Sequence, residues 1–297
     1  MTSALLIAVL AGLGGMLGWG FADLFAKKTI DEVGDVATLT IAHLFGILGL
    51  TILFFVYIGT GHVFTFPVTL FPWAGLAFFG VLQAAVYLLV YNGFGKGQVA
   101  ILNPLFSSFS GVVAVISILF LGEVVTPLIL LALALVFLGI FLLNTDFSAL
   151  RERRVSFFQV PGSKEVIAAT VLAAIWTLLW DQFVHGNDWF SYGLFMYVFM
   201  TIALLGYVLF LRIPLRVLNP NMWKYLALIG FFEMGAFMAI SWGYGATTHV
   251  SIVALLSGAF SLPTILFARL WLKEKTTRIQ LFASLLIIIG IMAVSVL

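Results

Sequence analysis

The chain has 297 residues, of which 63% are hydrophobic and 9% charged, and its 14 Lys and Arg exceed its 12 Asp and Glu by two. Soluble globular proteins carry about 25% charged residues, so this composition argues against a soluble enzyme, a nucleic-acid-binding protein and a disordered scaffold. The chain has no cysteine, which excludes disulfides, thiolate metal sites and cysteine nucleophiles.

Ten apolar stretches are long enough to cross a bilayer as helices, which takes about 20 residues each. Helices are expected because unpaired backbone groups are costly in lipid, and the alternation typical of a β-barrel is absent. No basic residue precedes the first stretch and no clear cleavage site ends it, so we interpret it as a retained span. The sequence predicts an all-α integral membrane protein with ten transmembrane helices, at residues 4–26, 36–58, 70–92, 98–121, 126–144, 165–183, 189–211, 222–244, 249–271 and 277–297.

The basic residues follow a one-sided pattern along these spans. The connections that follow the odd-numbered spans, counted with the adjoining span ends, hold 2, 1, 4, 3 and 4 Lys and Arg, which are all 14. The two termini and the other connections hold none. Because basic residues stay on the cytoplasmic side, we expect a multi-pass protein of the cytoplasmic membrane with both termini outside the cytoplasm.

A polar stretch in the middle of the chain divides the spans into two sets of five. We expect a first five-helix repeat at residues 1–144, a cytoplasmic linker at 145–164 and a second five-helix repeat at 165–297. Each repeat has an odd number of spans, so the second repeat is inverted relative to the first. Inverted repeats are common in secondary transporters, which bind substrate near the midplane between the repeats.

Matching residues in the two halves support this division. Residues 73–80 (WAGLAFFG) match residues 223–230 (WKYLALIG), and the later motif Gly93-Phe94-Gly95 matches Gly243-Tyr244-Gly245 at the same offset. After a slip of one residue, Glu123 matches Glu274.

The 5+5 inverted repeat, the two glycine–aromatic–glycine motifs and Leu121-Gly122-Glu123 together resemble the drug/metabolite transporter superfamily, in particular its EamA-type ten-helix branch. The resemblance covers essentially the whole chain. It implies transport of metabolites such as amino acids, sugars, nucleotide-linked compounds or small cations, in many cases outward. The proline that the family has about thirteen residues before the Glu is replaced by Ser110 and Ser261, whereas prolines occur at Pro104 and Pro263.

Glu233 is the most informative ionisable residue within a span. It lies about nine residues into its helix, roughly 13 Å from the basic end at 1.5 Å per residue, which is near the midplane. Its helical face continues through Phe237, Ser241 and Tyr244. The repeat-related face carries Gln83, Tyr87 and Tyr91. We interpret these faces as a substrate site, in which Glu233 binds substrate or couples protons. The alternative is a protonated Glu233 that forms a hydrogen bond between helices.

Asp23 and Asp181 occupy equivalent positions in spans 1 and 6, where each is a candidate for a gate or for proton coupling. The alternatives are a salt bridge from Asp23 to Lys27 and interfacial water around Asp181. Three tryptophans near them are candidate cavity walls or packing residues: Trp19, Trp176 and Trp180.

Spans 4 and 9 carry stripes of small and polar residues that include Ser107 and Ser257. Such stripes favour close helix packing, and the family resemblance adds the interpretation of a cavity wall. His43 and His249 are interpreted as hydrogen-bonded structural histidines. Glu123 and Glu274 precede spans 5 and 10, where a carboxylate favours the helix N-terminus.

The leading hypothesis is a secondary active transporter that moves a small amino-acid-like or amine-containing metabolite by alternating access, with proton coupling or exchange, and with export favoured. An uptake transporter for an organic cation such as a quaternary ammonium is the alternative, because an acidic residue among aromatic rings suits both. An intramembrane enzyme or a channel is more distant, since no catalytic motif such as His-Glu-x-x-His occurs. The expected partners are the substrate, membrane lipid and protons, without nucleic acid; no cofactor, metal or catalytic residue is expected.

Overall fold

The computed structural model describes residues 3–96, 99–145, 160–271, 273 and 276–296. All regular elements in these ranges are helices, and no described residue lies in a strand. The first half of the chain contains α1 (Ser3–Val33), α2 (Asp35–Gly59), α3 (Leu70–Lys96), α4 (Val99–Ser107), α5 (Phe109–Leu119) and α6 (Pro127–Asn144). The second half contains α8 (Ser163–Val184), α9 (Trp189–Leu211), α10 (Met222–Ala246), α11 (Val250–Gly258), α12 (Ser261–Trp271) and α13 (Arg278–Val296).

Nine helical segments in the described ranges are long and apolar enough to cross a membrane, and a shorter apolar segment covers residues 105–119. Together they account for the ten predicted crossings, and the prediction of an all-α multi-span membrane protein is confirmed. Local chemistry places several boundaries. The Thr126 hydroxyl accepts a hydrogen bond from the backbone N–H of Ile129 at 3.2 Å, with Pro127 as the first residue of α6.

Spans 4 and 9, predicted at 98–121 and 249–271, are each formed by two helices with a break in the middle, which was not predicted from the sequence. The break between α11 and α12 falls at Ala259, four residues before Pro263. A proline lacks the N–H that would bond to the carbonyl four residues earlier, and its ring clashes with that carbonyl. The break between α4 and α5 has another cause: the hydroxyls of Ser108 and Ser110 donate to the carbonyls of Leu105 and Ser107 at 2.7 and 2.9 Å. Such bonds compete with the helical backbone pattern.

The two broken spans meet at their breaks. A Cβ on Gly258 would lie 2.5 Å from the Cβ of Ser110, so the end of α11 directly contacts the first turn of α5. One helix belongs to each repeat. The breaks therefore lie together on the contact between the repeats, near the middle of both spans.

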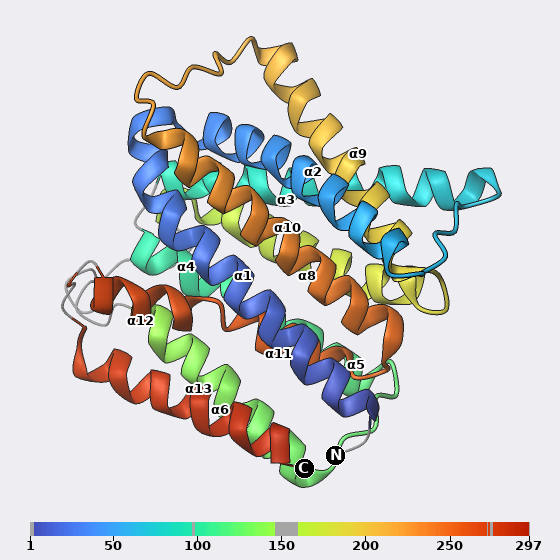
Figure 1. Cartoon of the computed structure of the whole chain (residues 1–297). Coiled ribbons are helices and arrows are strands. Elements are labelled where there is room, and N and C mark those ends of the chain that lie inside the picture. The colour runs from blue at the N-terminus through green and yellow to red at the C-terminus, as the bar shows by residue number, and fades with distance from the viewer. Residues whose placement is uncertain (1–2, 97–98, 146–159, 272, 274–275, 297) are drawn as a thin grey trace.

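The last helices of the two repeats, α6 and α13, pack side by side (Figure 1). Gly139 and Gly290 are equivalent in the repeat, and each faces the other helix. A Cβ on Gly139 would lie 2.6 Å from Ile287, and a Cβ on Gly290 would lie 2.6 Å from Val136. Equivalent glycines thus produce equivalent close contacts, as an internal two-fold relation requires.

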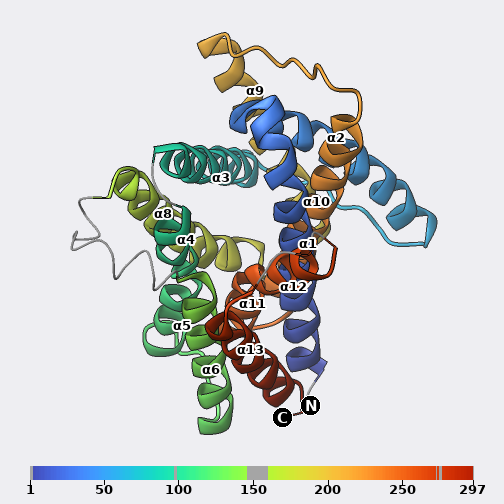
Figure 2. The ribbon, with the colours of Figure 1, turned by 90° about the vertical axis from the view of Figure 1, so that its left-hand side faces the viewer.

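The first repeat also packs against the second through α1, which crosses α10 (Figure 2). A Cβ on Gly14 would lie 2.7 Å from Ala239, and one on Gly18 would lie 2.6 Å from the carbonyl oxygen of Phe232. Small residues in membrane helices allow such close approach. The Gly14-x-x-x-Gly18 spacing of α1 thus lies in the contact with α10.

Both described termini, Ser3 and Val296, lie at the same end of the helix bundle (Figure 1). We call this end the terminal end. The described connections that follow α1 and α9, and the end of α3, lie away from this end, on the side that we call the basic end. The end of α3 and the start of α8 meet there through an ion pair between Lys96 and Glu165, at 2.7 Å.

Candidate functional site

An aromatic cluster lies where α1, α3, α8, α9 and α10 approach one another. Phe237 of α10 is fully buried, and its ring centre lies 5.6 Å from Trp19, 6.1 Å from Trp176, 5.8 Å from Tyr197 and 6.3 Å from Tyr87. Most of these pairs meet edge to face, which is a favoured arrangement for aromatic rings. The structure therefore brings the two predicted aromatic faces of spans 3 and 8 together, with Trp19 and Trp176 beside them.

Glu233 lies one helical turn before Phe237 and is 4% exposed. Its Oε2 lies 3.7 Å from Nδ1 of His43 on α2. The hydroxyl of Tyr87 on α3 lies within hydrogen-bonding reach of the same carboxyl. A carboxyl buried this deeply needs polar partners or a proton. Both partners belong to helices of the first repeat, whereas Glu233 belongs to the second, so Glu233 lies at the contact between the repeats.

His43 is a site residue whose place the sequence interpretation missed. Its side chain is fully buried, and Nδ1 donates a hydrogen bond to the carbonyl oxygen of Leu39 at 2.9 Å. Because a carbonyl only accepts, Nδ1 carries a proton, and Nε2 has no hydrogen-bond partner within the described part of the chain. The ring stacks on Tyr197 of α9 at 5.0 Å. An imidazole inside an apolar span signals a polar neighbour, but the sequence does not identify Glu233 as that neighbour.

Asp23 lies at the basic side of this cluster. Its side chain is exposed, yet it is close enough to Glu233 for the two carboxylates to interact electrostatically. The side chain of Lys27, the proposed salt-bridge partner, lies outside the described residues. Both interpretations of Asp23 stay predictions, and its proximity to Glu233 is new.

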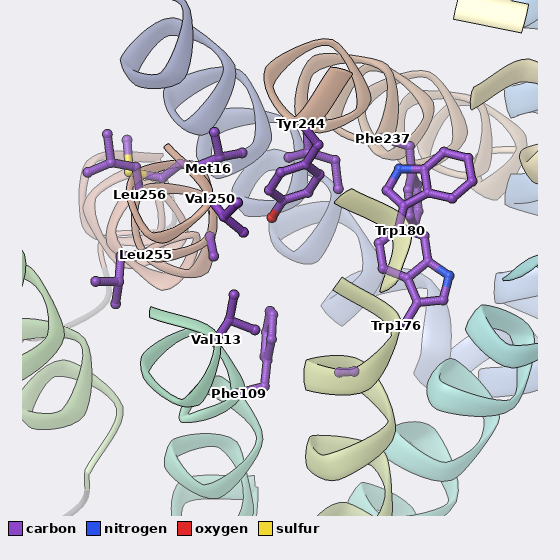
Figure 3. Packing of buried hydrophobic residues seen from close by; sticks show 14 of the residues in the cluster. Met16, Phe109, Val113, Trp176, Trp180, Phe237, Tyr244, Val250, Leu255 and Leu256 are labelled. Carbon is purple, nitrogen blue, oxygen red and sulfur yellow. The ribbon is translucent and has the colours of Figure 1, made fainter. Parts of the chain in front are cut away.

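Trp176 and Trp180 form a packed wall on α8 (Figure 3). Their rings stack at 5.5 Å, and both side chains are buried. The indole N–H of Trp176 donates to the carbonyl of Phe79 at 3.0 Å, and that of Trp180 donates to the Ser241 hydroxyl at 3.3 Å. Their polar groups are thus already satisfied, so in this conformation the two indoles are packing residues.

Other predicted residues retain unsatisfied polar atoms near the cluster. The indole N–H of Trp19 and the Oε1 of Gln83 are buried without a hydrogen-bond partner among the described residues. Tyr91 stacks on Tyr87 at 6.4 Å. A buried donor and a buried acceptor without partners are costly in a folded protein, which makes them candidate contacts for a polar solute.

The predicted serines of spans 4 and 9 have packing environments. The Ser257 hydroxyl donates to the Ala254 carbonyl at 3.1 Å, and a Cβ on Gly15 would lie 2.7 Å from the Cβ of Ser257. Ser257 therefore lies in the contact of α11 with α1. Ser107 is 1% exposed and its carbonyl accepts the Ser110 hydroxyl. Their role in substrate binding stays a prediction.

Asp181, Tyr244 and Glu123 form a second polar group toward the terminal end. Asp181 is 8% exposed, and its Oδ1 has no hydrogen-bond partner in the described ranges. Glu123 interacts electrostatically with both Asp181 and Tyr244. Figure 3 shows Tyr244 projecting from α10 between Val250 of α11 and Trp180 of α8.

The expectation that Glu123 serves the helix directly after it is wrong. Thr126 caps α6, whereas the Glu123 carboxylate accepts the backbone N–H of Ser251, the second residue of α11, at 2.9 Å. The sequence could not reveal this partner because it lies 128 residues away. Its repeat equivalent, Glu274, lies outside the described residues.

The fold and the central cluster define a multi-span α-helical membrane protein built from two five-helix repeats. The EamA-like transporter family matches residues 6–145 and 162–296, one segment for each repeat. The chain belongs to the EamA-like transporter family, within the drug/metabolite transporter superfamily. It is therefore a membrane transporter of small molecules.

The fold is also similar to a known crystal structure, described only as "Crystal structure of protein". The TM-score is 0.76, and the similarity covers 97% of this chain and 98% of the other at 15% sequence identity. At this identity the similarity supports the fold alone. No curated protein matches the chain.

Proposed function

We propose that this transporter is a secondary active exporter of a small amine-containing metabolite, such as an amino-acid-like compound, and that it works by alternating access. The observation that carries the proposal is Glu233, a buried carboxyl surrounded by aromatic rings where the two repeats meet. In transporters with inverted repeats, the substrate site lies at this kind of interface.

An ammonium group suits this site for two reasons. The carboxylate of Glu233 attracts a positive charge, and the rings of Trp19, Tyr87 and Phe237 offer faces for cation–π attraction. All 14 Lys and Arg of the chain lie in connections or near helix ends, so the sequence offers no internal cation at the depth of Glu233. Apart from the His43 imidazole at 3.7 Å, a charged carboxylate there has no cationic partner in the chain, which favours a cation from outside.

We expect proton coupling because a charged Glu233 requires a cationic partner. A buried carboxyl is stable when it is protonated or when it is paired with a cation, but not when it is charged and alone. A proton and an ammonium substrate then compete for Glu233, and release of one allows binding of the other. His43 and Asp23 are the neighbouring groups that could pass the proton toward the basic end. We place the protein in the cytoplasmic membrane with both termini outside the cytoplasm.

The test is net transport by the purified protein in proteoliposomes. Candidate amines and amino acids are first screened by thermal shift, because a ligand stabilises the folded protein by RT ln(1 + [L]/Kd). A compound that binds should then move against its gradient when a proton gradient is imposed, and its movement should saturate. The matched control is Glu165→Gln, which changes a carboxylate at the basic end away from the cluster.

Binding without saturable, proton-driven movement would contradict the coupling. Preference for a quaternary ammonium over primary amines, together with uptake, would favour the alternative substrate and direction. For the orientation, a reporter that fluoresces only in the cytoplasm is fused after Leu297. It should stay dark, and a bright fusion would contradict the proposed topology.

A further inference from the structure

Glu123 ties the two repeats together at the terminal end of the bundle. It lies in the connection between α5 and α6, and its side chain is 3% exposed although its neighbours Leu121, Gly122 and Val124 are exposed. Its Oε2 accepts the backbone N–H of Ser251 at 2.9 Å, and its Oε1 accepts the Ser251 hydroxyl at 2.6 Å. One carboxylate of the first repeat therefore holds the first turn of α11 in the second repeat.

This contact replaces the cap that α11 lacks from its own sequence. The residue before α11 is His249, whose side chain makes no capping hydrogen bond. The first N–H groups of a helix have no partner inside the helix and attract a negative charge. Glu123 satisfies both needs from a distant part of the chain, so α11 is correctly capped only while the two repeats are in contact here.

Ionisable groups of the second repeat surround the carboxylate. Nδ1 of His249 lies 3.9 Å from Oε1 of Glu123, and Asp181 of α8 and Tyr244 of α10 interact with it electrostatically. Burial lowers the pKa of His249, which disfavours a positive charge on the imidazole beside Glu123. Burial raises the pKa of Glu123, whereas its two hydrogen bonds from Ser251 lower it. The hydrogen bonds from Ser251 thus oppose the effect of burial on the pKa of this carboxyl.

We propose that Glu123 is the latch of the gate at the terminal end: it closes this end by capping α11 across the repeat contact, and it must release Ser251 each time that end opens. The proposal rests on the proposed function, since only an alternating transporter needs such a release. The latch itself supports a closed terminal end, because the Glu123 side chain is 3% exposed while it is bonded to Ser251, and Asp181 beside it is also buried.

The experiment measures opening directly, through the reactivity of a single cysteine. The chain has no cysteine, so Val113→Cys adds one thiol without background. Val113 is fully buried on α5 and is directed toward Val250 of α11 (Figure 3). The rate of its reaction with a small maleimide reports how often the region behind the latch becomes accessible. The variants Glu123→Ala and Ser251→Ala are compared with Glu165→Gln, which breaks the Lys96 ion pair at the basic end.

We expect Glu123→Ala to speed labelling of Val113→Cys about tenfold or more, because it removes two hydrogen bonds to a carboxyl group. A tenfold change corresponds to about 1.4 kcal/mol. Ser251→Ala removes only the hydroxyl bond and should give a smaller increase. Glu123→Gln keeps an acceptor for the Ser251 N–H and should fall between Glu123→Ala and the parent. Glu165→Gln should leave the rate unchanged.

An unchanged labelling rate in folded Glu123→Ala would overturn the latch, and so would an equal increase in Glu165→Gln, which would indicate general loosening. If Glu123→Ala does not fold, Ser251→Ala decides the matter by the same criterion. The labelling assay needs no substrate. A failed latch with normal transport is therefore distinguishable from failure of the proposed function, which the proteoliposome assay tests.

Discussion

Asp23 and Asp181 occupy equivalent positions in the two repeats but lie in different environments. Asp23 is exposed beside Glu233, whereas Asp181 is 8% exposed beside Tyr244 and the Glu123 latch. The backbone repeats, but the surroundings of the two carboxyls do not. An inverted-repeat transporter works by alternating access, so equivalent residues at its two ends can have different surroundings in one conformation. Together with the proposed Glu123 latch, we interpret this difference as a conformation that is closed at the terminal end.

The largest effect should come from the site between the two ends. In Glu233→Gln the side chain keeps its shape but loses its charge, and it copies Gln83 of the first repeat. Removing one partner of a buried ion pair costs about 3–5 kcal/mol, so affinity for an ammonium substrate should fall by a factor of about 100 or more. If Glu233 only couples protons, net transport should be lost while substrate exchange persists. Isotope flux in proteoliposomes separates the two results, and normal net transport with an unchanged pH profile would leave Glu233 as a structural hydrogen-bonding group.

A second prediction concerns a place where the repeats remain equivalent. Gly139→Val and Gly290→Val each force a side chain into a contact of 2.6 Å between α6 and α13. Overpacking of this kind costs about 1–3 kcal/mol, and the two variants should lower the melting temperature by similar amounts. Gly206→Val is the matched control, since nothing lies within 4 Å of its added Cβ. A large fall in melting temperature in only one of the two glycine variants would show that the two-fold relation does not extend to this pair.

The difference between the two aspartates can be measured directly. Asp23→Cys should react with maleimide at least about tenfold faster than Asp181→Cys, which corresponds to about 1.4 kcal/mol in opening free energy. Each variant carries a single cysteine, so no other thiol contributes to the labelling rates that compare the two ends. Equal rates would mean that the closed terminal end is not the main conformation of the protein in solution.

The smallest effect is expected at the aromatic rings. Tyr87→Ala removes a ring that contacts both Phe237 and His43, and loss of a cation–π contact of about 1 kcal/mol weakens affinity roughly fivefold. Tyr91→Ala and Tyr244→Ala should also weaken affinity, with Tyr244 affected least because it lies toward the terminal end. Tyr87→Phe retains the ring but loses the hydroxyl near Glu233, so it separates the contribution of the ring from that of the hydroxyl. Unchanged affinity in all three alanine variants, measured by calorimetry, would move the substrate site away from these faces.

Much of the site was predictable because helical periodicity places residues on a face. Glu233 and Phe237 share a face of α10, and the repeat relates that face to Tyr87 on α3, so their meeting follows from the inverted repeat. His43 and Tyr197 were not predictable as site residues. Their contact with Glu233 and Phe237 depends on how α2 and α9 are rotated, and a helix that is apolar on every side does not reveal its rotation.

The sequence by itself determined the membrane class, the ten crossings, the two repeats and the family, because apolar length, charge placement and internal similarity are properties of the chain order. Pro263 explains one of the two helix breaks, since it prevents a bond to Ala259, but neither break was predicted from the sequence. The tertiary structure alone decided which polar groups meet across the repeats. Glu123 caps a helix that begins 127 residues later, and Asp181 is buried while Asp23 is not. These differences depend on how the two repeats are placed against each other in one conformation, which residue order does not encode in any local pattern.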